Sequence, residues 1–345
     1  MQSVHLRILL TSSGSWHEGG PGGVVMMGGP SLIPGRARRL GSLWKTSAST
    51  LGIQDFARDF LITHKAPQPL RDSNHPSKLT MSNPTPTGPS QPGLTPEPPD
   101  AALNPPVQVI AMHGWGGDSR GWTPWLAATA GLGWSWSCGE RGYGQLQPMQ
   151  PSWQPQGRRL LVAHSMGPLL VPRALLAEAE LVVLLASFSR FVPPGPAGRR
   201  LETAIQGMGQ RLEPQHPLEP EEQQARRAQE LLQEFLVQAA APAPAPLLPA
   251  GPAETPIGAV GRALLLQDLQ RLASCRDLPD GFPEQRPVLI VEAGCDRIVT
   301  AEARALLRQR LPKAARLVLP EAGHALLDQA LIPAVLEWVQ GQLSP

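Results

Sequence analysis

The sequence predicts an α/β fold with a mostly parallel central sheet. Short apolar runs without polar alternation recur along the chain, as expected for strands that are buried on both faces. Segments with helical periodicity lie between these runs, and such alternation of strands and helices is typical of α/β proteins. Three of these runs are also followed within five residues by a residue able to carry chemistry, namely a serine, an aspartate and a histidine.

The elements of the expected core follow from these runs in chain order. The expected strands are residues 107–112, 160–162, 181–186, 287–293 and 316–319. The expected helices are residues 123–130, 169–180, 301–310 and 332–343. Pro172 lies inside the second helix, where it removes a hydrogen bond, so we expect that helix to bend or to start late. No strand is evident before Val107, so the predicted sheet is small.

Residues 188–287 interrupt the alternation, and we expect them to form a helical cap inserted into a core of residues 107–187 and 288–345. Glu219–Glu222 places acids and a proline in a first helical turn, which favours a helix start. An apolar stripe at helical spacing follows, and residues 259–272 form a further amphipathic pattern. Residues 239–250, rich in alanine and proline, are expected to form a loop.

Residues 1–106 differ from the rest in being rich in glycine, proline and serine, with poor periodicity. This composition predicts a disordered leader. We expect Met81 to be the true start of the protein, and the alternative is a basic targeting or docking tail.

Composition restricts the class of protein. The net charge of +2 is too small to indicate a nucleic-acid-binding surface. No run approaches the ~20 apolar residues of a membrane span, so we expect a cytoplasmic protein without one. The three cysteines form no zinc-binding spacing and are expected to be free thiols. Nothing in the sequence indicates a metal or an organic cofactor.

A nucleophile motif follows the second expected strand. The segment Ala163-His164-Ser165-Met166-Gly167 is the G-x-S-x-G pattern with alanine in the first position. The pattern needs small residues because the strand turns sharply into a helix and exposes the serine oxygen. Such a pentapeptide is weak evidence alone, but here it lies between an apolar strand and a helical pattern. We therefore predict that Ser165 is a catalytic nucleophile.

A serine hydroxyl needs a base to take its proton, and a carboxylate to orient that base. Asp296 and His324 each follow a late strand, in the order serine, acid, histidine that this motif requires. Asp296 could instead cap the helix that begins at residue 301, although Thr300 is at least as suitable. His324 could instead be a turn histidine.

The remaining histidines are weaker candidates for the base. His164 adjoins Ser165, and adjacent side chains on a sharp turn diverge. His113 ends the first expected strand, where it more plausibly shapes the following loop. The others lie in the leader or the cap: His5, His17, His64, His75 and His216.

Acyl transfer also needs hydrogen-bond donors for the developing oxyanion. We expect the backbone N–H groups of Met166 and Trp115 to supply them. Trp115 lies in the glycine-rich loop His113–Gly117, whose backbone can approach a substrate closely. The alternative, a phosphate-binding turn, fits neither known glycine spacing.

Four motifs of this sequence resemble those of the α/β-hydrolase superfamily. They are His113-Gly114-Trp115-Gly116, Ser165-Met166-Gly167, the Gly-x-Asp that ends at Asp296 and the Gly-His that ends at His324. Within the superfamily, His-Gly-Trp-Gly, the spacing from Asp296 to His324, and Phe188-Ser189-Arg190-Phe191 resemble the pimeloyl-acyl-carrier-protein methyl ester esterases of biotin synthesis. The resemblance covers residues 107–343.

The resemblance implies that Ser165 hydrolyses the methyl ester of an acyl chain held on acyl carrier protein. The substrate-binding residues that it implies are Trp115, Phe188, Phe191, Phe235, Leu236, Val237 and Gln238. Phe235 and Leu236 could equally pack the cap onto the core. In the family, arginines of a cap helix hold the acidic carrier protein, whereas Glu230 and Glu234 stand at the corresponding positions here.

Other arginines could take over carrier docking or could simply be solvated: Arg199, Arg200, Arg211, Arg226 and Arg227. Two alternative functions follow. One is a general small-substrate esterase, lipase or thioesterase of the same fold. The other is a non-catalytic binding protein, against which the complete set of serine, aspartate and histidine argues.

Overall fold

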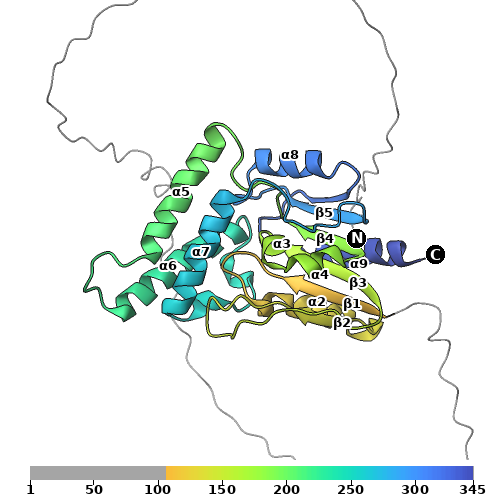
Figure 1. Cartoon of the computed structure of the whole chain (residues 1–345), viewed down its shortest axis with the longest axis horizontal. Helices are drawn as coiled ribbons and strands as arrows, with labels where there is room; N and C mark the ends of the chain where they lie inside the picture. The colour runs from red at the N-terminus through yellow and green to blue at the C-terminus, as the bar shows by residue number, and fades with distance from the viewer. Residues whose placement is uncertain (1–105, 345) are drawn as a thin grey trace, which may run out of the picture. The chain divides into compact units, whose positions relative to one another are not determined.

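The computed structural model describes residues 106–344, and the expectations about a leader and a start at Met81 lie outside these residues. The described chain forms a six-stranded sheet with the order β2-β1-β3-β4-β5-β6, in which all neighbours are parallel (Figure 1). The strands are β1 Val107–Met112, β2 Ser135–Cys138, β3 Arg158–His164, β4 Leu181–Leu185, β5 Val288–Ala293 and β6 Ala315–Leu319. The predicted α/β class with a parallel sheet is confirmed.

The helices lie between the strands, as the alternating pattern predicts. The α-helices are α2 Thr123–Thr129, α3 Gly167–Leu170, α4 Arg173–Ala177, α5 Pro196–Leu212, α6 Glu221–Ala240, α7 Ala259–Ser274, α8 Ala301–Arg310 and α9 Leu331–Leu343. Short 3-10 turns join some of them: η1 Ser119–Trp122, η2 Ala130–Leu132, η3 Ala245–Leu247 and η4 Pro252–Glu254. In the part of the chain that the structure describes, no helix has the length and apolar character to cross a membrane.

Both faces of the sheet are covered, which explains the unbroken apolar runs. Val109 of β1 packs in a buried cluster with residues of α2 and α9. The next residue, Ile110, points to the opposite face and packs in a cluster with residues of α4 and α8. Successive strand residues point to opposite faces, so a strand that is covered on both faces carries apolar residues on both of them.

The sheet contains one strand that the sequence did not predict. β2 pairs with β1 alone and lies at the edge of the sheet, with its four residues exposed or half-buried. An edge strand that is half in solvent alternates polar and apolar residues over too short a length to stand out. Five strands were expected, and β2 completes the six.

The helix after Ser165 is interrupted at Pro172, as expected. α3 ends at Leu170, and Pro172 precedes α4 in an extended conformation with ψ of 139°. Proline has no N–H to donate and disfavours helical geometry in the residue before it, so the helix divides into two short pieces.

Between β4 and β5 lie α5, α6 and α7, which we call the inserted helices; they group at one side of the sheet in Figure 1. The expected α6 and α7 are present, while α5 was not predicted. α6 continues to Ala240, into the stretch expected to be a loop. Leu232 of α6 and Leu265 of α7 pack with Trp115 and Met166 of the core in one buried cluster. The inserted helices therefore rest on the loops that carry the predicted catalytic groups.

Candidate active site

The turn at Ser165 has the geometry of a nucleophile elbow. Ser165 has a φ of 55°, a left-handed conformation that side chains other than glycine seldom adopt. Its N–H donates to the Leu185 carbonyl at 2.8 Å, and its carbonyl accepts from the Ser187 hydroxyl at 2.7 Å. A Cβ on Gly167 would lie 2.5 Å from the Met112 carbonyl oxygen, so only glycine fits there. Neighbouring strands therefore hold the strained serine in place.

Asp296 and His324 form a buried pair. His324 Nδ1 lies 3.0 Å from Asp296 Oδ2, and both side chains are almost fully buried. Asp296 Oδ1 accepts the amides of Ile298 and Val299 at 2.8 and 2.9 Å. Thr300, not Asp296, caps α8, because its side chain accepts from Ala303. The aspartate is therefore oriented toward the histidine instead of acting as a helix cap.

The surroundings favour the ionised form of Asp296. Burial opposes ionisation, but His324, its hydrogen bond and the two backbone amides together outweigh that penalty and lower the pKa of the carboxyl below its usual value. An ionised Asp296 accepts from Nδ1–H of His324, which leaves Nε2 as the nitrogen free to act as a base.

His324 Nε2 is buried and has no hydrogen-bond partner among the described residues. Ser165 and His324 come from the ends of β3 and β6, and the ring of His164, next to Ser165, lies 4.9 Å from that of His324. The structure thus brings all three predicted triad residues to one edge of the sheet, without a hydrogen bond from the serine to the histidine. Such bonds are often long in the absence of substrate.

His164 holds the main chain of His324. Its Nε2–H donates to the His324 carbonyl oxygen at 2.9 Å. Burial first, and then the neighbouring His324, lower the pKa of His164 to about 4. His164 is therefore neutral at ordinary pH and acts as a hydrogen-bond donor. The sequence had indicated only that His164 is not the catalytic base.

This depressed pKa predicts an acid-sensitive fold. Below the usual histidine pKa of 6.5, His164 is protonated in the unfolded chain, whereas in the folded chain it stays neutral down to about pH 4. Protons therefore favour the unfolded chain, and the free energy of unfolding falls as the pH drops from about 6.5 to about 4. The shift corresponds to about 3 kcal/mol. We expect His164→Gln, which keeps a donor for the His324 carbonyl, to lose stability less steeply than wild type in urea unfolding between pH 7 and pH 4.5. An identical pH dependence in the two proteins would contradict this expectation.

The loop after β1 lies against Ser165. A Cβ on Gly114 would come within 2.7 Å of the Ser165 Cβ, so the absence of a side chain permits this approach. Within residues 106–344, the amides of Trp115 and Met166 donate no hydrogen bond to another main-chain group. Both predicted oxyanion donors therefore remain available, one from the loop and one from the elbow.

A cavity of about 170 Å³ opens beside His324. Its walls include three of the predicted substrate-binding residues, Trp115, Phe235 and Leu236, and the rings of Trp115 and Phe235 meet edge to face at 4.8 Å. Phe188 and Phe191 pack against each other in the buried cluster under the inserted helices, away from the cavity.

Gln238 and the exposed Val237 also lie outside the cavity walls. In their place the walls contain groups that the sequence did not indicate. These are Trp122 and Trp125 from the segment after the loop His113–Gly117, Leu331 at the start of α9, and the segment 248–252 after α6. No pattern in the sequence marks them, since each reaches the cavity through the tertiary fold.

The site has no group of metal ligands, because no cluster of three or more potential ligand side chains occurs among the described residues. The three cysteines are free and unpaired with one another.

No family model matches the chain, and no curated protein matches it significantly. Solved structures do. A thermophilic esterase from Thermogutta terrifontis is 16% identical, with 70% of this chain and 93% of that chain covered and a TM-score of 0.45. The esterase EaEST from Exiguobacterium antarcticum is 14% identical, with 69% and 93% covered and a TM-score of 0.48.

An enol-lactonase from Burkholderia xenovorans LB400 is 14% identical, with 68% of this chain and 92% of that chain covered and a TM-score of 0.46. These proteins are similar to the chain in the arrangement of their elements. Their activities belong to them, and the function of this chain is inferred below from its own residues.

Proposed function

We propose that the protein is a serine carboxylic ester hydrolase that acts on small, uncharged acyl esters. The observation that carries this proposal is the buried Asp296–His324 pair with an unpartnered Nε2, beside a serine held in a left-handed elbow. Together these groups supply a nucleophile, a base and a residue that orients the base.

In the proposed reaction, the Ser165 hydroxyl attacks the ester carbonyl while His324 Nε2 accepts its proton. The N–H groups of Trp115 and Met166 donate to the oxygen that becomes negative in the tetrahedral intermediate. His324 then returns the proton to the departing alcohol, and the acyl group stays on Ser165. Water, deprotonated by His324, attacks this acyl-enzyme and releases the carboxylic acid.

The cavity supports the choice of a small, uncharged acyl group. Its walls are mainly aromatic and aliphatic, and among the described residues no lysine or arginine lines it. Its one carboxylate, Asp118, is already bound by Arg120 at 2.6 Å. A volume of about 170 Å³ suits a group the size of benzene, since a cavity of about 150 Å³ holds one.

The narrower activity that the family resemblance implies, hydrolysis of pimeloyl methyl ester on acyl carrier protein in biotin synthesis, stays a prediction. Carrier docking needs unpaired cations on the inserted helices. Arg211 is bound by Glu234 at 2.5 and 3.0 Å, and Arg227 is bound by Glu219. Carboxylates of this chain therefore occupy two of the five candidate arginines, whereas among the described residues Arg199, Arg200 and Arg226 form no ion pair.

The test is hydrolysis of p-nitrophenyl esters by the purified full-length chain. We expect the highest kcat/KM for acetate or butyrate and at least about a 10-fold lower value for a hemisuccinate, whose acyl group ends in a carboxylate that the cavity cannot pair. A fluorophosphonate should attach covalently to Ser165. No labelling and no hydrolysis would exclude an esterase. If the protein restored growth of a biotin-requiring bacterium that lacks its own pimeloyl methyl ester esterase, the result would support the narrower activity over the general esterase.

A further inference from the structure

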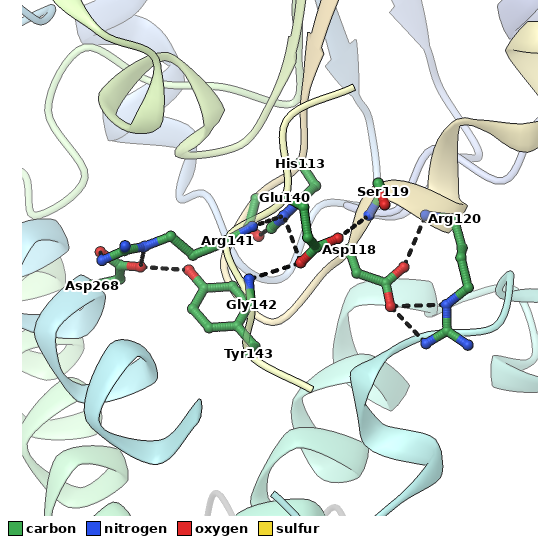
Figure 2. Close-up of polar contacts among 10 residues, drawn as sticks. His113, Asp118, Ser119, Arg120, Glu140, Arg141, Gly142, Tyr143 and Asp268 are labelled. Carbon is green, nitrogen blue, oxygen red and sulfur yellow. Dashed lines mark hydrogen bonds and ion pairs between the residues drawn. The ribbon is translucent and has the colours of Figure 1, made fainter. Parts of the chain in front are cut away.

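The loop that carries Trp115 is held by a buried polar network that reaches one of the inserted helices (Figure 2). The carbonyl of Gly114 and the N–H of Trp115 belong to the same peptide group and point in opposite directions. That carbonyl oxygen accepts from His113 Nδ1 at 2.8 Å and from the Gly117 amide at 3.2 Å. Fixing the oxygen therefore fixes the direction of the proposed oxyanion donor.

The segment after β2 sets the state of His113. The Arg141 amide donates to His113 Nε2 at 3.2 Å, so Nε2 is the bare nitrogen and Nδ1 carries the hydrogen. Glu140 accepts from the Ser119 and Gly142 amides, both at 2.8 Å, and so joins this segment to the start of η1, just after the loop His113–Gly117. Residues 140–143 thus contact the chain on both sides of that loop.

Asp268 of α7 holds the same segment from the other side. Its carboxylate is fully buried and accepts from Arg141 Nε at 2.7 Å, from Arg141 Nη2 at 3.1 Å and from the Tyr143 hydroxyl at 2.7 Å. α7 also touches the loop directly, because Trp115 Nε1 donates to the Leu265 carbonyl at 2.9 Å. A buried ion pair often adds little stability over apolar groups of the same size, although removing one partner leaves an uncompensated buried charge.

We propose that Asp268 is a positioning residue of the esterase: through Arg141 and Tyr143 it holds His113, and thereby aims the Trp115 N–H at the oxyanion. This inference rests on the proposed function. The inserted helices then complete the catalytic site, since one of their carboxylates sets the geometry of a donor in the core. The sequence separation between Arg141 and Asp268 hides this connection from any local motif.

The test compares Asp268→Asn with wild type in kcat, in KM and in affinity for a trifluoromethyl ketone, which Ser165 converts to a tetrahedral oxyanion. We expect kcat to fall about 10-fold to 100-fold, because a small misplacement of a catalytic group has an effect of that size. Affinity for the ketone should fall by the same factor as kcat/KM, and KM should change little. A folding defect alone would lower the fraction of active protein, but the folded molecules would bind the ketone as tightly as wild type.

The matched control is Glu221→Gln, which breaks the ion pair between Arg262 of α7 and Glu221 of α6, with 2.7 and 2.8 Å contacts but no route to the oxyanion loop. It should leave kcat and ketone affinity unchanged. Should Asp268→Asn fail to fold, Tyr143→Phe removes one hydrogen bond, keeps the Arg141 ion pair, and should give a smaller loss in the same two quantities.

Amide hydrogen exchange separates this inference from the proposed function. In Asp268→Asn, exchange of residues 113–119 should be faster than in wild type, whereas Glu221→Gln should leave it unchanged. This readout does not depend on ester hydrolysis. If the wild type proved inactive on esters, the proposed function would be overturned, and hydrogen exchange would still decide whether Asp268 holds the loop that carries Trp115. Unchanged exchange, or equal effects in the two variants, would overturn the positioning role.

Discussion

Replacing Ser165 with alanine is expected to abolish the nucleophilic pathway and to lower kcat for p-nitrophenyl esters by at least about 10,000-fold. The reason is that alanine removes the oxygen that forms the acyl-enzyme, while Trp115 and Met166 can still polarise the substrate. A residual rate above that of buffer is therefore expected from the oxyanion donors alone. The measurement is kcat and KM from initial rates over a range of substrate concentrations up to saturation, together with the loss of fluorophosphonate labelling.

The fold should survive this change. Alanine keeps the Cβ of Ser165 and hence the same strained φ of 55°, so the thermal midpoint should stay close to that of wild type. Ser274→Ala, at the exposed end of α7, is the control for loss of a hydroxyl elsewhere, and it should be fully active. Activity in the Ser165→Ala protein equal to wild type would exclude Ser165 as the nucleophile.

Asp296→Asn is expected to lower kcat by about 10,000-fold with little change in KM, because an amide at this position no longer enforces a hydrogen on His324 Nδ1. The histidine then adopts the tautomer with its hydrogen on Nε2, and the serine faces a donor instead of an acceptor. The backbone amides of Ile298 and Val299 still need an acceptor, which the asparagine oxygen supplies.

The control for this second variant is Asp277→Asn, which removes an exposed carboxylate that pairs with Arg310 at 2.9 Å. Asp277 has no proposed part in catalysis. The control variant should keep its activity. A loss of less than about 10-fold in Asp296→Asn would show that another group orients His324, and the triad assignment would have to be revised.

The core strands and the order of serine, aspartate and histidine could be predicted because they depend on local patterns. A strand buried on both faces is apolar at every position, as in Leu181–Leu185. Each proposed catalytic residue follows a strand with an apolar run, namely β3, β5 or β6. The elbow is equally local, since small residues at positions 163 and 167 permit the turn. The break at Pro172 follows from the chemistry of proline alone.

The features that escaped prediction depend on contacts between distant segments. β2 is recognisable as a strand only through its pairing with β1. Which aromatic side chains line the cavity is decided by how the inserted helices sit, so Phe188 and Phe191 became packing residues while Trp122 and Trp125 reached the cavity. The contact of Arg141 with Asp268 has no trace in either local sequence, because charges on two separate segments do not reveal their pairing.

The position of the inserted helices has a consequence for how the protein is made. β4 and β5 are neighbours in the sheet, yet all of residues 186–287 lie between them in the chain. While the ribosome synthesises this stretch, β4 presents an unpaired edge of five apolar residues to its surroundings, the kind of surface on which nascent chains aggregate. This edge of β4 finds its partner only after residues 288–293 emerge, so the sheet forms in two stages separated by the synthesis of the inserted helices.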